Sequence, residues 1–116
     1  MRQGDRGYRA VLVAAPVAEA ATLARALVSE GLVACANVVP GVQSIYRWQG
    51  EVEEAAEALI VLKTSAELLP RLAERVAQLH SYEVPEVLAL PVVFGTCAYL
   101  DWLAGSLLTN GVEDGA

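Results

Sequence analysis

The chain has little of the side-chain chemistry that common active sites need. Its 116 residues include one histidine, His80, and two cysteines, Cys35 and Cys97. There is no glycine-rich phosphate loop, no Cys-x-x-Cys or His-x-x-x-His pattern, and no second histidine to complete a hydrolytic Ser or Cys site. These absences leave an enzyme as the least supported class of function.

Charge is also scarce, and basic charge most of all. Charged residues make up 19% of the chain, and 14 acidic residues against 8 basic ones leave a formal net charge of -6. A nucleic-acid backbone would be repelled, so nucleic acid is not an expected partner. Hydrophobic residues make up 55% of the chain, more than one small domain can bury, which favours an oligomer.

Long hydrophobic runs are missing as well. The longest late run, residues 87–100, is broken by Pro91 and Gly95 and falls short of the ~20 residues that span a bilayer. The N-terminal segment has no separate apolar region or cleavage site of a signal peptide. We therefore expect a cytoplasmic protein with no membrane partner, in which Cys35 and Cys97 are reduced, buried thiols.

The hydrophobic pattern predicts one domain over residues 8–108, with short flexible tails at 1–7 and 109–116. A buried strand is expected over residues 8–15 and a helix over 17–30. A long hairpin follows over residues 34–63, with a bulge at Pro40-Gly41 and a turn in "WQGE". Its length predicts a far end that overhangs the domain.

The second half of the chain predicts two more helices around a short strand. Thr64 and Glu67 have the spacing of a capping box for the second helix. Pro70 requires this helix either to start later or to kink in its first turn. "EVLALPVV" predicts a strand, and Tyr99 to Leu107 a last helix. The order strand, helix, strand, strand, helix, strand matches the ferredoxin-like α+β sandwich, βαββαβ, with an extra C-terminal helix.

Four segments carry a resemblance to a known family. They read "LVACANVVPGVQSIYRWQGEV", "ALIVLKT", "LHSYEVPEVLALPV" and "YLDWL". In this order and spacing they resemble the CutA family of divalent-cation tolerance proteins, and the match runs from Val11 to Leu103. The resemblance implies a non-enzymatic homotrimer with a ferredoxin-like fold. It implies a role in tolerance of divalent metal ions such as copper, with no obligatory cofactor.

The resemblance also bears on metal binding. Family members reported to bind copper use a cysteine in the first strand and two adjacent histidines at an "HHPY" turn. Here Val13 and Leu79 replace two of those three donors, and only His80 remains. One imidazole cannot hold Cu(II) or another divalent cation tightly, since such ions take three or four protein donors. His80 is therefore open to three interpretations: packing or a turn hydrogen bond, a weak metal ligand, or acid-base work.

Two further groups of residues are candidates for function. By analogy with the PII signal proteins, Lys63, Tyr82 and Glu86 would line a cleft between subunits that takes a small anion; alternatively, Tyr82 packs and Glu86 faces solvent. Tyr46, Arg47 and Trp48 are expected at an interface near the hairpin tip. The acidic run of Glu51, Glu53, Glu54 and Glu57 is expected to be solvated.

Three classes of function follow from this pattern. The leading one is a trimeric protein of divalent-cation tolerance with weak metal binding. The alternatives are a PII-like small-molecule sensor that uses the intersubunit cleft, and a scaffold with no ligand. No motif indicates a particular protein client.

Overall fold

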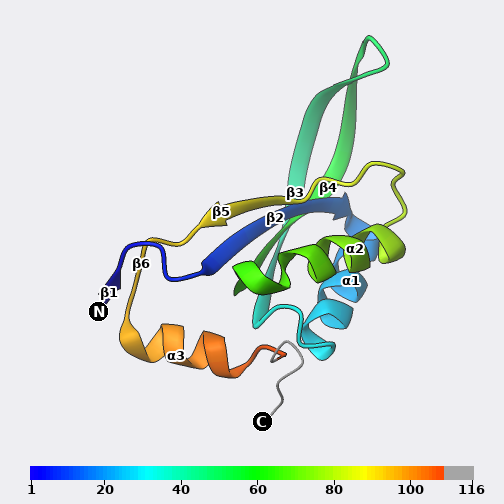
Figure 1. The fold of residues 1–116 in the computed structure, drawn as a ribbon. Coiled ribbons are helices and arrows are strands. Elements are labelled where there is room, and N and C mark those ends of the chain that lie inside the picture. Colours follow the sequence, from blue (N-terminus) through cyan, green and yellow to red (C-terminus); the bar gives the residue numbers. More distant parts are fainter. Residues whose placement is uncertain (109–116) are drawn as a thin grey trace.

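Four strands form the main sheet of the protein, which the computed structural model describes over residues 1–108. They are β2 (Tyr8–Pro16), β3 (Cys35–Trp48), β4 (Glu51–Ser65) and β5 (Leu88–Pro91), in the order β3-β4-β2-β5. Every neighbouring pair is antiparallel. This is the strand order of the ferredoxin-like fold, so the predicted α+β architecture is confirmed (Figure 1).

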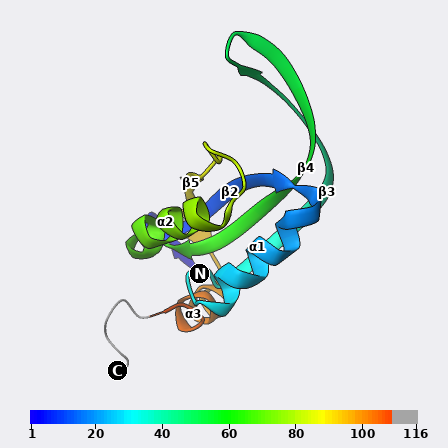
Figure 2. The same cartoon turned by 90° about the vertical axis from the view of Figure 1, so that its right-hand side faces the viewer.

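Two helices cover one face of this sheet. They are α1 (Val17–Ser29) and α2 (Leu69–Leu79), and both lie on the same side of β2 and β4 (Figures 1 and 2). Side chains alternate between the two faces of a strand, so every second residue of β2 and β4 points toward the helices. The fully buried core on that side includes Val11, Val13, Leu27, Ile60, Leu62, Leu72 and Val76.

The hairpin of β3 and β4 is as long as predicted and extends past the rest of the domain (Figure 1). Its register shifts between Val39 and Val42, where Gly41 has a φ of 77°, so the bulge at Pro40-Gly41 is confirmed. The turn places Gln49 and Gly50 at φ values of 50° and 85°. Positive φ at both central residues matches the right-handed twist of a hairpin.

The start of α2 differs from the predicted capping box. Ser65, not Thr64, precedes a short 3-10 helix, η1 (Ala66–Leu68), and makes no side-chain cap. Thr64 is fully buried, and its hydroxyl donates to the carbonyl oxygen of Leu32 at 2.7 Å. The capping box was wrong because this hydroxyl bonds to a distant segment. Pro70 lies in the first turn of α2, which confirms the later helix start.

The N-terminal residues include a short strand. Residues Arg2–Gln3 form strand β1, which pairs antiparallel with β6 (Phe94–Gly95). Arg2 also forms an ion pair with Asp101 at 2.9 Å, which ties this segment to the last helix, α3 (Cys97–Gly105). Residues 2 and 3 are therefore paired within the fold, the flexibility predicted for 1–7 stays a prediction, and the tail predicted for 109–116 lies outside the described residues.

The last helix and the cysteines complete the fold. Leu100 and Leu103 of α3 are buried, and the helix lies at the end of the sheet away from the hairpin tip (Figure 1). Cys35 and Cys97 are free thiols as predicted, but both are half-buried and not enclosed in the core. In residues 1–108, no helix combines the length and the apolar character that crossing a membrane requires.

Candidate functional site

His80 ends α2 and is held by both of its ring nitrogens. The backbone N–H of Tyr82 donates to Nδ1 at 3.1 Å, and Nε2 lies 2.8 Å from the carbonyl oxygen of Ala14. Because Nδ1 accepts, Nε2 must carry the proton and donate to that carbonyl. The side chain is 8% exposed and its ring lies 4.7 Å from the Tyr82 ring. These contacts favour the packing and turn-bond interpretation of His80 over the other two.

Val13 and Leu79 occupy the positions of the other two copper donors. Both lie close to His80, but neither side chain has a donor atom. Val13 precedes Ala14, the partner of His80, and its side chain is fully buried in the core. Leu79 is the last residue of α2 and is partly exposed. Among residues 1–108, no three His, Cys, Asp or Glu side chains gather closely enough to hold a metal ion.

Lys63 lies in β4, whereas Tyr82 and Glu86 lie in the segment between α2 and β5. Its ammonium group donates to the Asn37 side-chain oxygen and to Cys35 Sγ, the latter at 3.2 Å. Cys35 Sγ is also 3.7 Å from the Tyr99 hydroxyl, and this contact, with burial, raises the pKa of Tyr99. One chain therefore does not form the predicted cleft by itself. A neighbour would have to supply Lys63, so the intersubunit cleft stays a prediction.

Tyr82 and Glu86 do line a groove together, beside the base of the hairpin. Its volume is about 690 Å³, and it also includes Ala14, Ser44, Ile45, Tyr46, Trp48, Glu57, Ser81, Glu83 and Val84. We call it the Glu57 groove. Figure 2 shows the hairpin curving above the side of the sheet on which the segment between α2 and β5 lies. The groove's lining residues therefore come from three parts of the chain that are far apart in the sequence: β2, the hairpin, and the segment between α2 and β5.

Glu57 forms the floor of this groove and is a residue that sequence reasoning misplaced. It was expected on a solvated acidic face, yet it is 5% exposed and accepts a hydrogen bond from the Tyr82 hydroxyl at 2.6 Å. That bond and burial raise the pKa of Tyr82 to about 12. The sequence did indicate this burial, because Glu57, Leu59 and Val61 are spaced two residues apart and so share one face of an aliphatic strand.

The three candidate interface residues near the hairpin tip point to different faces of β3. Tyr46 and Trp48 line the Glu57 groove and are 45% and 44% exposed. Arg47 lies between them in β3 and so points to the opposite face, where its Nη1 donates to the Gly50 carbonyl oxygen at 3.4 Å. Their predicted interface role is not tested within a single chain and stays a prediction.

The face of the sheet opposite α1 and α2 carries a group of aliphatic side chains. Leu88, Leu12 and Val61 lie side by side in one row across β5, β2 and β4. Leu88 and Leu90 are 58% and 49% exposed. Together with Leu59 and Val39, which share this side of the sheet, these residues form what we call the open face. A contiguous apolar surface of this kind usually marks an interaction site.

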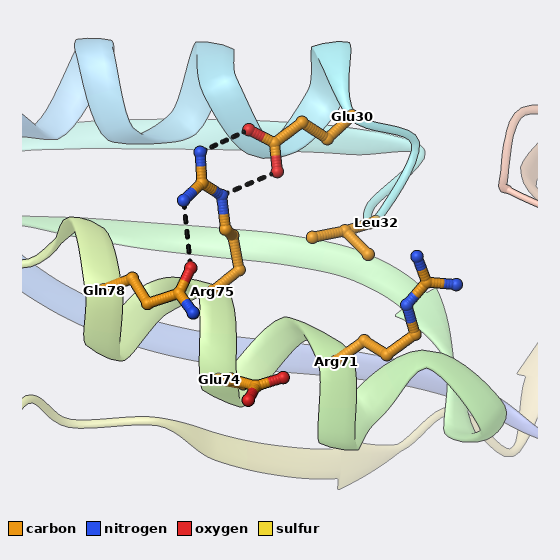
Figure 3. Close-up of a pocket in the computed structure, with 6 residues that line it drawn as sticks. All are labelled: Glu30, Leu32, Arg71, Glu74, Arg75 and Gln78. Carbon is orange, nitrogen blue, oxygen red and sulfur yellow. Dashed lines mark hydrogen bonds and ion pairs between the residues drawn. The ribbon is translucent and has the colours of Figure 1, made fainter.

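A smaller pocket between α1 and α2 is a structural junction. It has a volume of about 200 Å³ and is lined by Glu30, Leu32, Arg71, Glu74, Arg75 and Gln78 (Figure 3). Arg75 donates to both Glu30 oxygens, at 2.8 and 3.0 Å, and to Gln78 at 3.0 Å. The Arg75 guanidinium lowers the pKa of Glu30. With its charge matched in this way, Arg75 joins the helices and offers little to an anionic ligand.

Comparisons with known proteins agree with the fold. Residues 9–106 match the family described as "CutA1 divalent ion tolerance protein". The chain is similar to the divalent-cation tolerance protein CutA of Thermus thermophilus, with 55% identity over 80% of this chain and 91% of that protein. It is 47% identical to the chloroplastic CutA 1 of Oryza sativa, over 83% of this chain and 55% of that protein. The crystal structure of CutA1 from Oryza sativa matches with a TM-score of 0.85 and 42% identity, over 89% and 95% of the two chains.

Proposed function

Because this chain belongs to the CutA1 family of divalent ion tolerance proteins, we propose that it acts in divalent-cation tolerance as a non-enzymatic homotrimer. The observation that carries the proposal is the family match over residues 9–106, which spans all four strands of the main sheet. Relatives that match over most of this chain carry the name of divalent-cation tolerance proteins. The absence of a recognised nucleophile and base motif supports a role without catalysis.

The open face and the hairpin support the homotrimer. Exposed Leu88 and Leu90 would be buried if β5 and β2 packed against another copy. The overhanging end of the hairpin carries exposed Tyr46 and Trp48, which need an apolar neighbour. A protomer measuring 47 × 27 × 22 Å also extends far enough to reach across an adjacent subunit. Burial of these surfaces would explain the high hydrophobic content of the chain.

In the proposed function, this protein binds divalent metal ions only weakly. His80 has both ring nitrogens engaged, and residues 1–108 contain no gathered set of three donors. Cu(II) and Zn ions bind tightly only where several donors converge. We therefore propose that divalent cations are held loosely, by exposed carboxylates near the hairpin tip such as Glu51, Glu53 and Glu54.

Two measurements test the proposed function. A copper-sensitive host that lacks its own family member should grow at higher copper concentrations when it expresses this protein. Calorimetric titration of the purified assembly with Cu(II) should give no site tighter than the micromolar range, since no site with three donors exists in residues 1–108. Failure to restore copper tolerance would refute the role. A stoichiometric site of nanomolar affinity would refute the loose mode of binding.

Trp48→Ala tests the interface predicted at the hairpin tip. Loss of the half-exposed indole should weaken assembly by about 2 kcal/mol, because tryptophan anchors rank among the largest contributors to interfaces. Sedimentation equilibrium measures the association constant. Arg47→Ala is a useful comparison, since its side chain lies on the other face of β3. Unchanged association in Trp48→Ala would place the trimer contact elsewhere.

A further inference from the structure

The only lysine of the chain lies against one of its two free cysteines. Lys63 of β4 stands directly opposite Cys35, the first residue of β3, in the antiparallel ladder. Side chains opposite each other in such a ladder share one face of the sheet, with Cβ atoms about 4.5–5.5 Å apart. The Lys63 Nζ donates to Cys35 Sγ at 3.2 Å. Strand register therefore brings an amine nitrogen next to a sulfur atom.

This contact is complete within one chain. Asn37, two residues farther along β3, accepts a second hydrogen bond from the Lys63 ammonium through its side-chain oxygen. The Tyr99 hydroxyl lies 3.7 Å from Cys35 Sγ, so α3 lies beside the sulfur, at the end of the sheet away from the hairpin tip (Figure 1). Nζ and Sγ therefore meet without a neighbouring subunit, and a reaction of one with the other requires no free ligand surface.

Cys35 has the surroundings that oxidation of a thiol requires. Thiols enclosed in an apolar core are inert, whereas partly exposed thiols in an electropositive environment are the reactive type. Cys35 is half-buried and forms no disulfide, and its sulfur accepts a hydrogen bond from a cation. Hydrogen peroxide is little larger than water, so partial exposure is sufficient for it to reach the sulfur. Once oxidised, this sulfur has the Lys63 nitrogen beside it as a nucleophile.

We propose that hydrogen peroxide converts Cys35 and Lys63 into a reversible sulfenamide crosslink between β3 and β4. In the first step Cys35 Sγ attacks one peroxide oxygen and the O–O bond breaks. The sulfur, oxidised by two electrons, becomes a sulfenic acid, and the other oxygen leaves as water with the thiol proton.

The second step joins the two side chains without further oxidation. The Lys63 ammonium gives one proton to solvent, and its nitrogen attacks Sγ. An S–N bond forms, the S–O bond breaks, and the leaving hydroxide takes a second proton from the nitrogen to become water. Sulfenic acids condense with nitrogen in this way. A dithiol reverses the step: it is oxidised to a disulfide, and the thiol and the amine are restored. The site uses none of the carboxylates assigned to divalent cations, so the two proposals can fail independently.

Peroxide treatment of the purified assembly, followed by mass spectrometry of the intact chain, tests the proposal. The Cys97→Ser protein is the parent for all measurements, because Cys97 Sγ lies 3.0 Å from the Met1 amine and is a second thiol beside a nitrogen. The treated chain should be lighter by two hydrogen atoms, and dithiothreitol should restore its mass. Trypsin should release residues 26–47 and 48–71 as one joined species, because a linked Lys63 is not cleaved. An unchanged mass, or added oxygen with normal cleavage at Lys63, would overturn the proposal.

Lys63→Arg provides the decisive variant, because it keeps a cation beside the sulfur but removes the nucleophile. A guanidinium group is not deprotonated in proteins and so does not attack the oxidised sulfur. Oxidation should then stop at the sulfenic acid, which the reagent dimedone traps. Dimedone labelling of Cys35 should be about tenfold higher than in the parent protein, where the amine consumes the sulfenic acid. Equal labelling with and without Lys63 would show that the amine does not capture the sulfur, and would overturn the proposal.

Two further measurements keep the test decisive if Lys63→Arg fails to fold. Reductive dimethylation of the native assembly blocks the amine of Lys63, the only lysine, without a mutation, and it should prevent the loss of two hydrogen atoms on peroxide treatment. Cys35→Ser should prevent it as well. The same loss of mass in either protein would place the oxidation at other residues, and would overturn the assignment of the crosslink to Cys35 and Lys63.

Discussion

Leu88→Asp is expected to convert the assembly into folded monomers. Leu88 is 58% exposed in the single chain and lies on the open face in the edge strand β5, beside Leu12. In a monomer the new carboxylate would remain in water and cost little. In an apolar interface it would be withdrawn from water, which costs several kcal/mol per charge, so association should weaken by about 3 kcal/mol or more per contact. Light scattering coupled to size-exclusion chromatography measures the change in mass.

Val28→Asp is the matched control for this experiment. Val28 is an exposed aliphatic residue of α1 on the other side of the sheet, 41% exposed. The same change of charge there should leave the mass of the assembly unaltered. Far-ultraviolet circular dichroism should show native secondary structure in both variants. If Leu88→Asp keeps the wild-type mass, the open face is not the interface and the trimer must be built from the hairpin alone.

His80→Ala is expected to destabilise the protein by about 2–3 kcal/mol without changing copper uptake. The change removes two hydrogen bonds and leaves the carbonyl of Ala14 and the N–H of Tyr82 without their partner in a half-buried place. Each unsatisfied buried group costs about 1–3 kcal/mol, and partial access of water reduces this sum. Urea denaturation at a fixed protein concentration measures the free energy of unfolding, because assembly also contributes to stability.

His80→Gln separates hydrogen bonding from the loss of the ring. Its amide can donate to Ala14 and retain part of the stability, so an intermediate free energy of unfolding is expected. Cu(II) titration of both variants should match the wild type. A loss of copper binding in His80→Ala, with stability unchanged, would make the histidine a ligand and reverse our interpretation of its two bonds.

Local patterns were sufficient to predict most of the secondary structure. A valine-rich stretch indicated β3, an aliphatic stretch indicated the second half of β4, and Pro40-Gly41 indicated the bulge where the register shifts. Helical spacing of leucines indicated α1 and α2. These features depend on residues that are close in the sequence, so the chain itself carries the information. The short pair of β1 and β6 was missed because two residues are too few to show a period.

Side chains that bond across long distances were predicted less well. Thr64 has the spacing of a capping residue, but Leu32 offers its hydroxyl a buried carbonyl oxygen and so removes it from the helix end. Glu57 was counted with its exposed neighbours, although the Tyr82 segment covers it. Lys63 was grouped with Tyr82 by analogy, while the register pairs it with Cys35. In each case the partner lies at least 25 residues away.

The sequence by itself determined the family, the order of strands and helices, and the loss of two of three copper donors at Val13 and Leu79. These follow from residue identity and short-range spacing. Tertiary structure alone decided that both ring nitrogens of His80 bond to backbone groups and that Glu57 is buried and accepts a hydrogen bond from Tyr82. Solvent access and hydrogen-bond partners depend on which distant segments meet, and the sequence pattern does not show that the segment after α2 meets β4 at Glu57.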